Sequence, residues 1–77
     1  RSTMLDPSVL KEVPIEVCVR NKVIPISNEG GVIKLAMSDV YNVLAIDQIK
    51  RHFDKTAKIV PLYCSEQEIN ELIERYY

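Results

Sequence analysis

The chain has 77 residues, of which 47% are hydrophobic and 27% are charged. This balance is typical of one small soluble globular domain and excludes disordered and collagen-like chains. Ten Lys and Arg against eleven Asp and Glu leave a net charge of −1, so neither nucleic acid nor an anionic membrane is the expected partner. The longest apolar run, from Val43 to Ile46, is far shorter than the roughly 20 residues of a membrane span.

The two cysteines, Cys18 and Cys64, have no C-x-x-C spacing and are too few for a disulfide scaffold. We therefore expect reduced thiols in a cytoplasmic protein. The sequence begins at Arg1 without an initiator Met or a signal peptide, which suggests a fragment of a longer chain. We expect residues 1–5 to be a tag remnant or a disordered terminus and residues 6–77 to form a single domain.

The first elements along the chain are two short helices. Asp6 and Pro7 predict a helix start. Pro14 predicts the start of a second helix, with Ile15, Cys18 and Val19 on one side. The alternation of apolar residues over 15–19 also fits a β-strand, and we favour the helix.

Three strands and two longer helices follow. Strands are predicted over residues 23–27, 32–37 and 57–63, and the first two are joined by a turn over residues 28–31. A helix over residues 42–53 presents an apolar stripe of Val43, Ile46, Ile49 and Phe53. Ser65 and Glu68 form the capping box of a last helix, whose core side is Ile69, Leu72, Ile73 and Tyr76.

Two prolines set the expected strand order. Pro25 lies in the first strand and Pro61 in the third, and a proline cannot donate a ladder hydrogen bond. These strands should therefore lie at the edges. The predicted fold is a small α+β domain with a three-stranded mixed sheet in the order 1-2-3. It contains one hairpin, one βαβ crossover and helices packed on the sheet.

No motif for catalysis or metal binding is present. The only glycine pair, Gly30 and Gly31, is followed by Val32 instead of the Lys-Ser or Lys-Thr of a phosphate loop. One histidine, His52, and two unpaired cysteines do not provide a zinc site or a nucleophile with its base. We predict no catalytic residue, no metal and no cofactor. The residual alternative is a small thiol enzyme.

The candidate interaction residues are aromatic or basic. Tyr63 and Tyr77 lie at element ends, where tyrosine often anchors an interface. Lys50 and Arg51, with Lys55, could accept an anion. We interpret the glutamates of the last helix as solvated surface that complements the helix dipole.

Three segments carry a resemblance to a known family. They are the strand Val-Ile-Pro-Ile at residues 23–26, the strand end Leu-Ala-Met-Ser-Asp at residues 35–39, and the terminal helix ending Ile-Glu-Arg-Tyr-Tyr at residues 73–77. In order and spacing they resemble the N-terminal domain of type II secretion and type IV pilus assembly ATPases, in the C-terminal half of that MshEN-like region. The match covers residues 9–77. The chain departs from the family pattern at Val40 and Asn21, where proline and tyrosine are frequent.

The resemblance implies a bacterial, cytoplasmic, non-catalytic domain that docks a motor ATPase on the inner-membrane platform protein. Its partners would be that platform protein and its own downstream ATPase domain, without nucleic acid and without direct membrane insertion. The alternative function is sensing of cyclic di-GMP. Family members that bind this dinucleotide do so through a duplicated Arg-Leu-Gly motif upstream of the matched portion, and this chain has no Arg-Leu-Gly.

Overall fold

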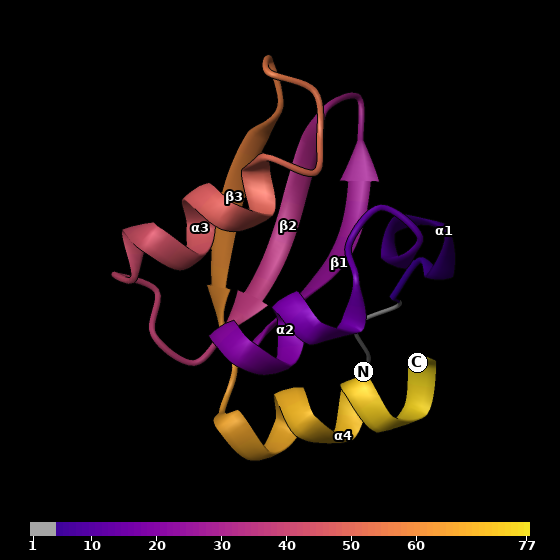
Figure 1. Cartoon of the computed structure of the whole chain (residues 1–77), viewed down its shortest axis with the longest axis vertical. Coiled ribbons are helices and arrows are strands. Elements are labelled where there is room, and N and C mark those ends of the chain that lie inside the picture. Colours follow the sequence, from indigo (N-terminus) through magenta and orange to yellow (C-terminus); the bar gives the residue numbers. More distant parts are fainter. Residues whose placement is uncertain (1–4) are drawn as a thin grey trace.

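The computed structural model describes residues 5–77 (Figure 1). The helices are α1 (Pro7–Leu10), α2 (Ile15–Asn21), α3 (Val43–Lys50) and α4 (Glu66–Tyr76), and the strands are β1 (Val23–Glu29), β2 (Val32–Met37) and β3 (Lys58–Tyr63). This is the α+β architecture expected from the sequence, and the segment after Pro14 is helical rather than extended. Within residues 5–77, no helix is long and apolar enough to cross a membrane.

The strands form one mixed sheet in the predicted order β1-β2-β3. β1 is antiparallel to β2, and β3 runs parallel to β2 after the crossover through α3. The hairpin turn is tighter than predicted, because the strands reach Glu29 and resume at Val32. Only Gly30 and Gly31 turn the chain, with φ values of 59° and 87°. Positive φ at both positions defines a type I′ turn, whose twist matches that of the flanking strands.

Proline interrupts the free edge of β3. The amides of Lys58 and Cys64 donate to Gly31 O at 2.8 Å and to Met37 O at 3.0 Å, so alternate residues of the strand face β2. Pro61 belongs to the outward-facing set, where its missing N–H costs the ladder nothing. The premise used to place this strand at an edge is therefore confirmed.

The opposite edge, on β1, is bent and partly covered. The pairing register shifts between Pro25 and Ser27, which leaves Ile26 as the extra residue of a β-bulge. The Ile26 carbonyl accepts a hydrogen bond from Asp6 N at 2.8 Å, which fixes the entry of α1 beside the strand. This contact also holds Leu5 on the core, where it is only 7% exposed.

Leu5 corrects one sequence-based expectation. The expected tag remnant or disordered terminus over residues 1–5 is wrong for this leucine, because its side chain belongs to the hydrophobic core. Residues 1–4 lie outside the described part of the chain. The largest fully buried core side chains include Ile24, Leu35, Met37, Ile49 and Ile69, which come from both sheet and helices. No polar or charged residue of the described chain is buried.

The buried line of α2 differs from the predicted stripe. Cys18 is fully buried, whereas Ile15 and Val19 are 42% and 46% exposed. The helix is therefore rotated about its axis relative to the prediction. Asn21, one turn after Cys18, contributes to this rotation, because its Nδ2 donates a hydrogen bond to Gln48 Oε1 of α3 at 2.9 Å. The helix ends at Lys22, whose φ of 56° is left-handed.

The buried line of α3 also differs from the predicted stripe. The helix begins after Asn42, and its inward residues are Ala45 and Ile49, four positions apart. Val43 stands two residues before Ala45 and therefore points to the opposite side, where it is 70% exposed. The small Ala45 side chain suits the face that packs on the sheet. The predicted members Ile46 and Phe53 are half-buried against the core.

The last helix follows the prediction most closely. Ser65 Oγ accepts a hydrogen bond from Glu68 N at 3.1 Å, and Glu68 Oε1 accepts one from Ser65 N at 3.0 Å. These reciprocal bonds are the predicted capping box. Ile69 and Ile73 are buried and Leu72 packs against the core, but the prediction is wrong for Tyr76, which is 36% exposed and lies outside the core cluster.

Candidate protein-interaction site

Three apolar side chains are exposed around the start of α3. Tyr41 is 88% exposed, Val43 is 70% exposed and Leu44 is 73% exposed. We call these three residues the α3 entry patch. Such exposure of neighbouring apolar groups is not required by the core, and covering one of these side chains would contribute about 1.5–3 kcal/mol.

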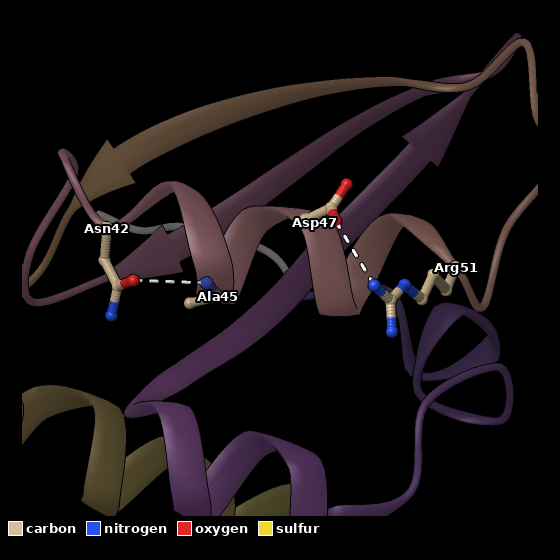
Figure 2. Close-up of polar contacts among 4 residues, drawn as sticks. All are labelled: Asn42, Ala45, Asp47 and Arg51. Atoms are coloured by element: carbon tan, nitrogen blue, oxygen red, sulfur yellow. Dashed lines mark hydrogen bonds and ion pairs between the residues drawn. The ribbon is translucent and has the colours of Figure 1, made fainter.

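The backbone that carries the α3 entry patch is held by hydrogen bonds. Asp39 Oδ1 accepts one from Tyr41 N at 3.0 Å, and Asn42 Oδ1 accepts one from Ala45 N at 3.2 Å. Figure 2 shows the second bond, which caps α3. These two bonds hold the backbone of the turn and of the helix start from which the patch side chains project.

Tyr63, a predicted interaction residue, lies at the end of the sheet from which the chain continues to the α3 entry patch. It is the last residue of β3, is 72% exposed, and pairs in register with Met37, the last residue of β2. The segment leading to the α3 entry patch leaves the sheet directly after Met37, at the end where β3 also finishes (Figure 1). The structure therefore places Tyr63 at the same end of the sheet as the start of that segment.

The predicted residues Lys50 and Arg51 lie together at the other end of α3. With Asp47, Phe53 and Lys55 they line a hollow of about 370 Å³, which we call the basic hollow. Arg51 Nη2 lies 3.5 Å from Asp47 Oδ2, one turn earlier on the helix (Figure 2). Both partners are well exposed, so this ion pair contributes little to stability.

Tyr77, the fourth predicted interaction residue, uses its phenol inside the domain. Its hydroxyl donates a hydrogen bond to Val13 O at 3.0 Å and lies 3.3 Å from Cys18 Sγ. Burial and the neighbouring thiol raise the pKa of the Tyr77 phenol above its usual range. The contact ties the end of α4 to the junction of α1 and α2, which sequence analysis did not anticipate because the partners are 64 residues apart.

The two thiols and the histidine come from three different parts of the fold. Cys18 is fully buried in α2, Cys64 follows β3, and His52 follows α3. Burial raises the pKa of the Cys18 thiol, and burial with the nearby Glu68 charge raises that of Cys64. Both shifts disfavour the nucleophilic thiolate. Over residues 5–77, no group of three or more His, Cys, Asp and Glu residues could hold a metal ion.

The exposure of the α3 entry patch was missed by the sequence analysis. The segment Val-Leu-Ala-Ile at the start of α3 is apolar on all sides of a helix that buries only one of them. That run was a usable signal, because a helix covering one face of a sheet must leave part of it exposed. The apolar periodicity alone does not predict which residues of this run are exposed.

Comparisons with known proteins identify the family. The family model for the MshEN domain matches residues 1–77. The chain is 37% identical over 73 residues to the type IV pilus assembly ATPase PilB of Myxococcus xanthus, covering 95% of this chain and 12% of that protein. It is 32% identical over 75 residues to PilB of Thermus thermophilus, covering 94% of this chain and 8% of that protein. The chain thus spans about a tenth of the length of these relatives.

Two solved structures share the fold. A structure of MshE with cdg superposes with a TM-score of 0.84 at 19% identity, over 96% of this chain and 52% of that one. The N-terminal domain of XpsE superposes with a TM-score of 0.64 at 23% identity, over 100% of this chain and 46% of that one. The relatives are bacterial ATPases of type IV pilus assembly and type II secretion. The chain belongs to the MshEN domain family, which forms part of the N-terminal regions of these ATPases.

Proposed function

We propose that this domain is a non-catalytic docking module that couples a secretion or pilus motor ATPase to its inner-membrane platform protein. The observation that carries the proposal is the α3 entry patch, a group of apolar side chains that the domain's own fold leaves uncovered. Apolar and aromatic residues of this kind form the energetic centres of protein interfaces. The domain would act in the cytoplasm, held at the membrane through its partner.

The chemistry of the chain supports docking rather than turnover. Its sequence contains no phosphate loop, and its thiols are shifted toward the protonated form. The relatives are named as ATPases, and this chain covers only a small part of them. ATP hydrolysis would therefore belong to a domain that follows this one in the longer protein.

The sheet edges are weaker candidates for the docking surface than the α3 entry patch. A partner strand added to β3 would meet Pro61, which offers no N–H in the middle of the edge. The edge of β1 is occupied in part by the bond from Asp6 N to Ile26 O. Of a sheet edge and an apolar helix face, the helix face is thus the docking surface that the geometry favours.

A titration against the cytoplasmic part of the platform protein tests the proposal. Leu44→Glu places a charge in the α3 entry patch while keeping a residue type that suits the first turn of a helix. We expect it to weaken binding by at least about tenfold, as loss of an apolar anchor does. Ile15→Glu is the matched control, because it puts the same charge on an exposed apolar residue in the first turn of α2.

Two results of this titration would contradict the proposal. One is the absence of binding by the folded, unaltered chain. The other is equal weakening by Leu44→Glu and Ile15→Glu, which would reflect added negative charge instead of loss of a contact. Circular dichroism of each variant confirms that the fold is retained before binding is compared.

Sensing of cyclic di-GMP is the second candidate function. The similar fold of MshE, whose structure contains cdg, favours testing it. Calorimetry with the dinucleotide separates the two candidates, because the docking proposal predicts no saturable heat from these 77 residues alone. Saturable binding in the micromolar range would establish the sensing function.

A further inference from the structure

One face of the sheet is not covered by helices along β3. Of the described helices, only α3 makes extensive contacts with β3, and Ile59 of this strand packs on the core that contains Ile49 of α3. In Figure 1, α3 lies in front of β3, and α4 lies at the end of the sheet where β3 finishes. The face of β3 that is turned away from α3 therefore has no helix over it among residues 5–77. Parallel strand pairs such as β2 and β3 are normally covered on both faces, so this pair departs from the usual arrangement on one of them.

Burial alternates along β2 and shows which side chains belong to the uncovered face. Ile33 and Leu35 are fully buried, whereas Val32 is 36% exposed and Lys34 is also exposed. Successive residues of a strand point to opposite faces, so Val32 and Lys34 share the uncovered face. Further along the strand Ala36 is fully buried. The uncovered part of β2 is therefore its first half.

The register of the sheet extends this face onto β3. Val32 pairs with Lys58 and Lys34 pairs with Val60, and paired residues lie on the same face of a sheet. Leu62, two residues after Val60, is 38% exposed. We call these five residues the open sheet face: Val32, Lys34, Lys58, Val60 and Leu62.

The open sheet face combines apolar surface with two unpaired ammonium groups. A sheet face that meets water usually carries polar side chains, but three of these five residues are aliphatic. Lys34 and Lys58 make no ion pair within residues 5–77. Glu29 is the one carboxylate of the three strands, and it makes none either. Lysine stems pack along apolar surface while their ammonium groups stay available to a carboxylate.

The sheet determines what kind of chain can bind on this face. The backbone groups of β2 are used in the ladders with β1 and β3, so the face offers no backbone hydrogen bonds to a partner. A helix satisfies its own backbone groups and can present one apolar side. The six residues of β3 are about 20 Å long, which matches about four turns of a helix.

We propose that the open sheet face binds an amphipathic helix of a partner protein, whose apolar side is bordered by carboxylates. Its apolar residues cover the three aliphatic side chains, and its carboxylates pair with Lys34 and Lys58. A second copy of this chain does not fit, because two open sheet faces in contact would bring like charges together. The site lies on the opposite face of the sheet from α3, so it is separate from the α3 entry patch and does not depend on the proposed function.

Two designed peptides test the proposal on the unaltered chain. Both are helices of about 14 residues with leucines on one side. Glutamates border the leucines in the acidic peptide, and lysines replace those glutamates in the basic peptide. We expect the acidic peptide to bind at least about tenfold more tightly, measured by fluorescence anisotropy of the labelled peptides at low salt. Its amide chemical-shift changes should fall on residues 32–36 and 58–62 of the domain.

Charge reversal on the domain should exchange the two peptides. Lys34→Glu with Lys58→Glu should bind the basic peptide more tightly than the acidic one, because the charges that attract and repel change places. Lys11→Glu with Lys55→Glu is the matched control, since it changes the net charge equally at exposed residues outside the sheet. This control should keep the preference for the acidic peptide.

A second double variant tests the apolar part of the contact. Val32→Thr with Leu62→Thr keeps residues that suit a strand and removes aliphatic surface from the open sheet face. The acidic peptide should bind this variant at least about tenfold more weakly. Circular dichroism confirms that each variant is folded before binding is compared.

Three outcomes would overturn the proposal. They are no binding of the acidic peptide up to millimolar concentration, equal binding of the two peptides, and an unchanged preference in the variant of Lys34 and Lys58. Leu44→Ala should bind the acidic peptide like the unaltered chain. Loss of binding in that variant, with chemical-shift changes centred on residues 41–44, would assign the contact to the α3 entry patch and contradict the proposal.

Discussion

Tyr77 shows how one side chain can connect distant parts of a small domain. Its hydroxyl bonds to Val13 O, so replacing Tyr77 with Phe leaves this carbonyl without its partner. We expect Tyr77→Phe to lower the free energy of unfolding by about 1 kcal/mol, measured by urea denaturation. Tyr63→Phe is the control and should change stability by less than about 0.5 kcal/mol, because that ring is 72% exposed. Equal free energies of unfolding for the two variants would show that the Tyr77 hydroxyl does not stabilise the fold.

The same phenol predicts an alkaline limit to stability. The folded state raises the pKa values of Tyr77, Cys18 and Cys64, so it favours their protonated forms. The unfolded chain loses these protons from about pH 8.5 for the thiols and about pH 10 for the phenol. Stability should therefore be constant near neutral pH and fall as the pH rises through these values. Urea denaturation from pH 7 to 11 measures this, and a flat profile would contradict it.

Lys22 is the one described non-glycine residue with positive φ. Its left-handed conformation ends α2, and an L side chain at this position costs about 1 kcal/mol relative to glycine. Lys22→Gly also loses the ion pair with Glu66, but that pair is exposed and contributes less than the relieved strain. We expect a net stabilisation of about 0.5 kcal/mol by urea denaturation. A destabilised variant would show that the ion pair outweighs the backbone strain.

At the level of elements, local signals predicted most of the fold. The capping box of Ser65 and Glu68 defines α4, and two prolines correctly placed the outer strands. These signals depend on the backbone of a few neighbouring residues, so they can be recognised from the sequence alone. The rotation of α2 and α3 about their own axes was not predicted, because it depends on tertiary contacts such as Asn21 with Gln48.

The rotation of α3 decides which residues form the α3 entry patch. Ala45 is fully buried and Leu44 is 73% exposed, although both are small or medium apolar residues in the same helical turn. We expect Ala45→Leu to destabilise the domain by about 1–3 kcal/mol through overpacking. Leu44→Ala should change stability by less than about 0.5 kcal/mol. Thermal unfolding of both variants measures the difference. The reverse order of stability would mean that another side of α3 packs on the sheet.

At the scale of the whole molecule, the domain combines an apolar core with an exposed apolar patch at the start of α3. The core leaves no buried polar group among the described residues, which agrees with a module that acts through contact. Composition and spacing predicted the small α+β core with its three-stranded mixed sheet. They could not predict the α3 entry patch, because the side of α3 that packs on the sheet is decided by tertiary contacts.

The central claim is that the α3 entry patch is the surface that meets the platform protein. Amide chemical-shift mapping of the labelled domain during titration with the cytoplasmic part of that protein tests it residue by residue. The account predicts that the largest shifts fall on residues 39–45 and on Tyr63, with smaller changes in the basic hollow and on the outer side of α4. Shifts centred on α2 or on the sheet edges, with the α3 entry patch unchanged, would contradict it.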